Sequence, residues 1–203
     1  MTLVHDYETD LDTRSYSRLY HDERKMAFSA MDCVLNGEKG IYASSALTTG
    51  TRAYELLDDH GVRSMRELEE PHRDALLTAN MEEAGRFAAR LRERLGGHEL
   101  VITPAPFAAP GWTQAEYLAF WEELIRTRVK AVYFNDGWEL SNGCTFEYAV
   151  AREAGVATFA ADGSALPPDA AAGMMERAAA EVEARGYDAS RLRINLDRIR
   201  RAR

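Results

Sequence analysis

Residues 129–159 read VKAVYFNDGWELSNGCTFEYAVAREAGVATF, and this stretch decides the fold. Its first part, 129–134, is apolar and rich in β-branched and aromatic residues, which predicts a buried strand. A polar loop follows over 135–142, then a helix over 143–153 and a second short strand over 156–160. A strand, a helix and a strand in this order predict two parallel strands joined by a crossover helix.

The same alternation of strands and helices extends to both sides of this stretch. The other predicted strands are 40–44 and 99–103, and the other predicted helices are 17–35, 77–95, 114–126, 170–185 and 191–200. Gly61 and Pro71 break the charged segment 53–75 into short helices or an insertion. Leu192 to Asn195 is the only weak candidate for a fifth strand.

This alternation predicts an α/β fold of the Rossmann-like or flavodoxin-like type. We expect a single doubly wound parallel sheet of four or five strands with helices on both faces. Residues 1–38 would form an N-terminal extension with an acidic segment and one helix. Residues 39–203 would form the α/β domain, which ends in an arginine-rich tail that is either solvated or in contact with a neighbouring subunit or an anion.

Composition excludes several classes of protein. The 203 residues are 46% hydrophobic, which suits one compact core. The net charge of −8 argues against general binding to nucleic acid, and no run of about 18 apolar residues predicts a membrane span. Cys33 and Cys144 have neither disulfide nor zinc-ligand spacing, so we expect no metal and no cofactor. The acidic N-terminus is unlike a signal peptide, and a cytoplasmic location is expected.

Two loops at strand ends have the composition of a ligand site. In a parallel sheet, ligands bind at the carboxyl ends of the strands. The first loop is Ser44-Ser-Ala-Leu-Thr-Thr-Gly-Thr-Arg52, whose hydroxyls and free backbone N–H groups suit an anion. A loop of this composition is more often only a turn. It contains neither the dinucleotide fingerprint nor the phosphate-loop lysine.

The second loop runs from Asn135 to Glu147 and contains two further acids, Asp136 and Glu139, and Trp138. Glu147 falls in the second turn of the predicted helix, where the helix dipole favours an ionised carboxylate. That suits a nucleophile. The alternative is a plain solvent-facing or capping glutamate.

Together these segments resemble the nucleoside 2-deoxyribosyltransferase superfamily, including its nucleoside 5′-monophosphate N-glycosidase branch. The resemblance covers 40 to about 159 and begins with Ile41-Tyr42-Ala43-Ser44-Ser45. Its more specific part is the spacing of Ser141, Glu147 and Gly155: a Ser or Asp six residues before a Glu, on a helix closed by Gly eight residues later.

The resemblance implies cleavage or exchange of an N-glycosidic bond through a covalent glycosyl-glutamate. Glu147 would be the nucleophile, and Tyr42 would orient its carboxylate. The family's further acid falls on Glu123, although the apolar stripe centred on Trp121 turns that position away from the core. Glu122 or Asp136 are the alternatives.

The resemblance also implies a substrate site. Ser141 stands where the monophosphate-cleaving branch has its phosphate-binding serine, which favours a nucleoside 5′-monophosphate over a nucleoside. Trp112 and Trp138 either stack on the base or pack in the core. The complete set of predicted substrate contacts is Ser45, Thr48, Thr49, Gly50, Arg52, Trp112, Asp136, Trp138, Ser141, Asn142 and Gly143.

Two other functions suit the same segments. One is a nucleotide-sensing domain of the same fold that binds its ligand without turnover. The other is a glycosidase acting on NAD-like dinucleotides. Related proteins complete each pocket with residues of a neighbouring subunit, so the resemblance also implies a homodimer or a larger homo-oligomer.

Overall fold

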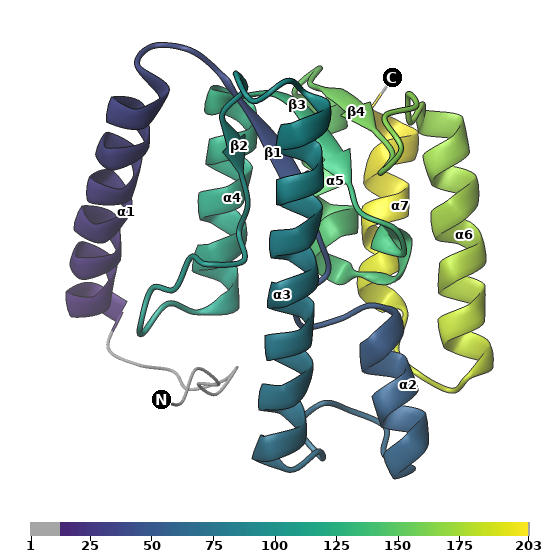
Figure 1. Ribbon diagram of the computed structural model, residues 1–203. Helices are drawn as coiled ribbons and strands as arrows, with labels where there is room; N and C mark the ends of the chain where they lie inside the picture. Colours follow the sequence, from purple (N-terminus) through teal and green to yellow (C-terminus); the bar gives the residue numbers. More distant parts are fainter. Residues whose placement is uncertain (1–12, 203) are drawn as a thin grey trace.

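A computed structural model describes residues 13–202 and shows an α/β fold with a four-stranded sheet in the order β2-β1-β3-β4 (Figure 1). All neighbouring strands are parallel. The strands are β1 (Gly40–Ser44), β2 (Val101–Ile102), β3 (Val129–Phe134) and β4 (Ala157–Phe159). The predicted fold class and its four strands are confirmed. The weak fifth candidate was wrong, because Leu192 lies in a helix and its side chain is fully buried there.

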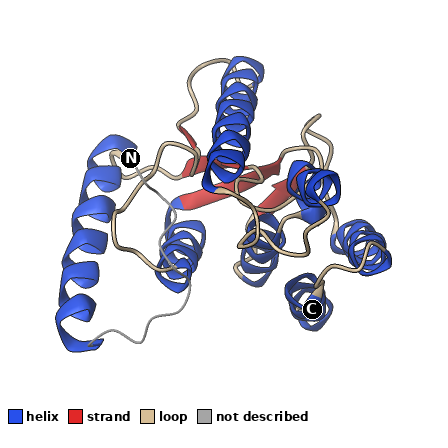
Figure 2. Ribbon diagram, turned by 90° about the horizontal axis from the view of Figure 1, so that it is seen from below, coloured by secondary structure: helices blue, strands red, loops and turns tan. Residues whose placement is uncertain are grey.

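The helices form layers on both faces of the sheet, which Figure 2 shows edge-on between them. They are α1 (Thr13–Leu35), α2 (Thr51–His60), α3 (Glu70–Arg94), α4 (Gln114–Arg128), the 3-10 helix η1 (Trp138–Leu140), α5 (Asn142–Glu153), α6 (Pro168–Ala184) and α7 (Ser190–Arg201). Helix α3 covers one face through Phe87 and Leu91. Helices α4 and α5 cover the other face, and α1 packs outside α4 through Phe28 and Phe120.

The alternation of side chains along β1 sends neighbouring residues to opposite faces. Ile41 and Ala43 pack against α3, whereas Tyr42 lies in the core formed with α4 and α5. Residues two apart in a strand point to the same side. Ser44 therefore faces α5 together with Tyr42, at the carboxyl end of the strand.

Pro71 begins a helix instead of breaking one. It occupies the first turn of α3, where its missing N–H leaves no intrahelical hydrogen bond unmade. The segment 53–75 therefore contributes most of α2, a short connection and the start of α3.

The arginine-rich tail forms α7, and its side chains pair with acids of neighbouring helices. The ion pairs are Arg193–Glu183, Arg198–Glu153 and Arg200–Glu176. These contacts hold α7 against α5 and α6. The acidic segment at the N-terminus lies outside the described residues. Within residues 13–202, no helix is long and apolar enough to cross a membrane.

Candidate functional site

The candidate site lies where the chain changes direction across the sheet. From β1 the chain passes to β2 on one side and then to β3 on the other, so the loops after β1 and β3 leave the sheet in opposite senses. Such a switch point leaves a crevice at the carboxyl edge of a parallel sheet. Here the two loops meet: the Asn135 amide donates to the Ser44 carbonyl at 2.9 Å, and the Asn142 amide donates to Thr49 Oγ1 at 3.0 Å.

Glu147 is the buried carboxylate at this crevice, with 7% of its surface exposed. It sits in the second turn of α5 on the side that faces β1. The Tyr42 hydroxyl donates to its Oε1 at 2.8 Å, and the Ser44 hydroxyl donates to its Oε2 at 2.6 Å. Each carboxylate oxygen thus accepts one hydrogen bond and keeps a further lone pair.

Two opposing effects set the charge state of Glu147. Burial raises its pKa, and the hydrogen bonds from Ser44 and Tyr42 lower it. Burial is the larger effect, and the resulting pKa is about 7. Burial disfavours the charged carboxylate, and donors aimed at its oxygens favour it. The result is a glutamate that changes charge near neutral pH, which suits either a nucleophile or an acid–base group.

Cys144 stands one turn before Glu147 and does not share this reactivity. Burial is the main cause that raises the pKa of its thiol to about 12, and the charge of Glu147 adds to it. The thiolate is the nucleophilic form of cysteine, so Cys144 is inert at neutral pH. The polar chemistry of this crevice therefore centres on Glu147.

Two helices begin beside the crevice and present their positive ends to it. Helix α5 is capped by Ser141, whose Oγ accepts from the Cys144 amide and lies 3.3 Å from Thr49 Oγ1. Helix α2 begins after Gly50 without any side-chain cap. No side chain caps the N–H groups of its first turn, and N–H groups at a helix start suit an anion.

The other predicted contacts of the first loop surround this helix start. Arg52 is exposed and donates to Asn80 Oδ1 at 3.1 Å. Thr48 is exposed, and Ser45 is buried. Among the described residues, the Ser45 hydroxyl and Asn142 Oδ1 are buried without a hydrogen-bond partner. Gly143 follows in the first turn of α5.

The structure does not bring three of the predicted residues to Glu147. Glu123 lies on the outer side of α4, where its carboxylate pairs with Arg24 of α1 at 3.3 Å. Trp112 is buried and donates to Glu23 Oε2 at 2.7 Å. Trp138 is buried on the ring of Tyr148, with 5.1 Å between ring centroids. The apolar surroundings of both indoles place them in the core, so neither offers an open face to a base.

Asp136 lies on the opposite face of the sheet from Glu147. It lines a cavity of about 380 Å³ with Phe87, Arg90 and Arg94 of α3. The alternative acid Glu122 is engaged on α4 by Arg126 at 2.8 Å. None of the proposed second acids therefore contacts Glu147.

Ser44 is the residue that sequence reasoning missed. Its signal was present, because Ser44 stands two residues after Tyr42 on the predicted strand and the two must face the same side. Within residues 13–202, no group of three His, Cys, Asp or Glu side chains could hold a metal ion. Comparison of the chain with protein-family models, curated proteins and solved structures finds no match.

Proposed function

We propose that the protein is an N-glycosidase or glycosyltransferase that acts on a nucleoside 5′-monophosphate or a nucleoside, with Glu147 as its nucleophile. The observation that supports this most is the buried Glu147 carboxylate held by Tyr42 and Ser44 at the switch point of the sheet. Two fixed donors orient the carboxylate and leave lone pairs free for attack. The resemblance of this segment to nucleoside 2-deoxyribosyltransferases points the same way.

In the proposed reaction, a Glu147 oxygen attacks the anomeric carbon of the sugar. The bond between that carbon and the base nitrogen breaks, its electron pair leaves with the base, and the base takes up a proton from an acid or from solvent. Water or a second base then attacks the glycosyl ester, and the carboxylate leaves. The Tyr42 and Ser44 hydroxyls stabilise the carboxylate in both its starting and its regenerated state.

The helix starts favour a substrate with a 5′-phosphate. The first turn of α2 has N–H groups without a side-chain cap, and Arg52 lies in the same turn. Thr49 and Ser141 add hydroxyls at the start of α5. A phosphate at a helix N-terminus gains from the dipole and from the unpaired N–H groups.

Chromatographic detection of free base tests this function. The purified protein is incubated with ribo- and deoxyribonucleoside 5′-monophosphates, the matching nucleosides and NAD. Base release is expected from the monophosphates, with a loss of at least about 1,000-fold in Glu147→Gln. Glu123→Gln is the matched control, because its carboxylate pairs with Arg24 away from the crevice, and it should keep its activity.

Two results would overturn the proposal. Full turnover in Glu147→Gln would exclude the covalent mechanism. Absence of base release with every substrate, together with a thermal shift caused by one of them, would favour a nucleotide-sensing domain. The low exposure of Glu147 is the observation that favours a role without turnover.

A further inference from the structure

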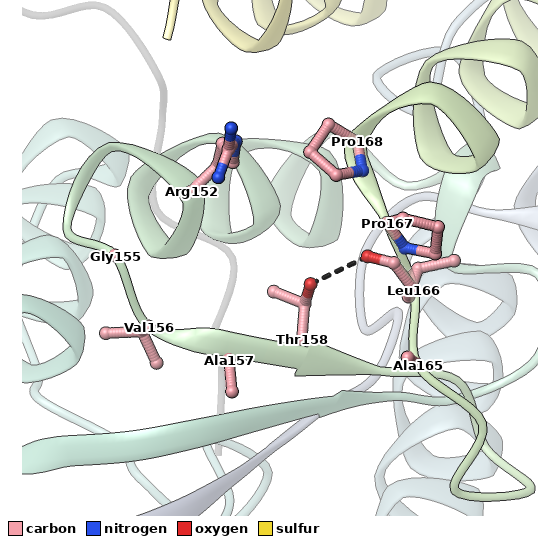
Figure 3. A pocket seen from close by; sticks show the side chains of 9 residues that line it. All are labelled: Arg152, Gly155, Val156, Ala157, Thr158, Ala165, Leu166, Pro167 and Pro168. Atoms are coloured by element: carbon pink, nitrogen blue, oxygen red, sulfur yellow. Dashed lines mark hydrogen bonds between the residues drawn. The ribbon is translucent and has the colours of Figure 1, made fainter. Parts of the chain in front are cut away.

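A second cavity lies at the amino edge of the sheet, away from the crevice at Glu147. It measures about 260 Å³, opens to solvent, and is bordered by the last turn of α5, the start of β4 and the connection that leads into α6 (Figure 3). Its walls are mainly apolar. The apolar lining side chains are Val156, Ala157, Ala165, Leu166, Pro167 and Pro168.

Arg152 is the only charged residue in this lining. Its Nε is buried and has no hydrogen-bond partner among the residues that the structure describes. A guanidinium cannot lose its charge, and a buried N–H group without a partner is costly. Arg126 and Arg198, which also lie beside α5, both pair with Glu153, whereas no such pair is formed by Arg152 within residues 13–202.

The other polar groups at this cavity are already engaged. The Thr158 hydroxyl donates to the Leu166 carbonyl at 2.8 Å, as Figure 3 shows, and the Tyr148 hydroxyl donates to the same carbonyl at 2.9 Å. The charge of Asp169, in the first turn of α6, raises the pKa of Tyr148, whereas the charge of Arg152 lowers it. Both charges therefore lie near the Tyr148 hydroxyl. Its negative charge would oppose a ligand with two negative charges.

We propose that this cavity binds a small organic monocarboxylate with a compact apolar body. The guanidinium of Arg152 would hold the carboxylate through two parallel hydrogen bonds, a geometry that matches its planar fork. The apolar walls would cover the rest of the ligand. Because the cavity and the crevice at Glu147 lie at opposite edges of the sheet, this inference does not depend on the proposed function.

Benzoate is a suitable probe, and benzamide is its neutral counterpart of nearly the same shape. Binding is measured by calorimetric titration of the full-length protein. Benzoate is expected to bind wild type at least tenfold more tightly than benzamide. Arg152→Met keeps an apolar side chain of similar reach but removes the charge, and it should weaken benzoate binding at least tenfold. Arg177→Met, on the exposed side of α6, should leave it unchanged.

Two further variants locate the site. Thr158→Leu adds bulk on the side of β4 that faces α5 and Leu166, toward which the Thr158 side chain points in Figure 3, and it should also abolish benzoate binding. Glu147→Gln should bind benzoate like wild type, even if it has lost all base release. The inference is wrong if wild type binds no benzoate, if benzamide binds equally well, or if Arg152→Met and Thr158→Leu bind benzoate as wild type does.

Discussion

The Ser44 hydroxyl donates a 2.6 Å hydrogen bond to Oε2 of Glu147, across a separation of 103 residues in the chain. Both residues are buried, and Ser44 is fully so. A hydrogen bond to a charged group in such surroundings is stronger than one between neutral groups. This contact makes the end of β1 part of the electrostatic environment of the carboxylate on α5, and it can be tested through the charge state of Glu147.

Ser44→Ala is expected to move the pH dependence of activity toward higher pH. Removing a donor from the ionised carboxylate disfavours the charged form, so the pKa of Glu147 rises further above about 7. A shift of about one to two pH units is expected for the acidic limb of kcat/KM, since such a bond is worth about 1.5–3 kcal/mol. Tyr42→Phe should shift the limb in the same direction.

Thr48→Ala provides the control for this profile. Thr48 carries a hydroxyl in the loop that follows β1, but it is exposed and should not alter the profile. An acidic limb that stays in place in Ser44→Ala, or moves to lower pH, would contradict the assignment of that limb to Glu147.

Glu147→Gln is expected to change how stability depends on pH. The folded-state pKa of Glu147 is raised from 4.5 to about 7, so the folded protein binds one more proton than the unfolded chain between these values. Stability of wild type is therefore lost as the pH rises through this window, by on the order of 3 kcal/mol. Glutamine does not titrate, so the variant lacks this loss.

Urea unfolding at about pH 5 and about pH 8 measures this difference. Relative to wild type, Glu147→Gln should be more stable at about pH 8 than at about pH 5. Its free energy of unfolding minus that of wild type should therefore be larger at the higher pH. Glu123→Gln should show no comparable change, because that carboxylate is partly exposed and paired with Arg24. An equal difference between Glu147→Gln and wild type at both pH values would show that Glu147 titrates normally in the folded protein.

Gly50→Ala should destabilise the loop that leads into α2. Gly50 has φ of +118°, and an added Cβ would lie 2.8 Å from the Cβ of Ala46. Gly61 has φ of +64° with nothing within 4 Å of such a Cβ, so Gly61→Ala costs only the left-handed backbone, about 1 kcal/mol. Thermal unfolding should show a clearly larger loss for Gly50→Ala, and equal losses would refute the close contact.

Arg52→Met should raise KM for a nucleoside 5′-monophosphate about tenfold and leave KM for the matching nucleoside unchanged. The reason is that Arg52 belongs to the first turn of α2, whose uncapped N–H groups are proposed to hold the phosphate, and its guanidinium, now on Asn80 Oδ1 at 3.1 Å, is the positive side chain of that turn. Arg86→Met is the control, because Arg86 pairs with Glu83 on an exposed part of α3. Equal changes in KM for both substrates would place the phosphate elsewhere.

The order of strands and helices was determined by the sequence because it follows from local patterns. The apolar run of Val129 to Phe134 and the stop at Gly155 both act over a few residues, and the structure confirms the strand and the end of the helix there. Tyr42 and Glu147 were singled out through a family resemblance of their segments, and a hydrogen bond of 2.8 Å joins them in the structure. Pro71 was misinterpreted because a proline suits a helix start as well as a helix end, and only the packing of α3 on the sheet selects between them.

The sequence by itself thus determined the layers, the strands and the carboxylate at the centre of the candidate site. Only the tertiary structure decided which side chains surround that carboxylate. Ser44 reaches Glu147 because β1 and α5 pack together, while Glu123 is drawn to Arg24 by the docking of α1. Trp112 and Trp138 are likewise buried in the core. Contacts between residues far apart in the chain depend on how helices pack, and local periodicity does not encode that packing.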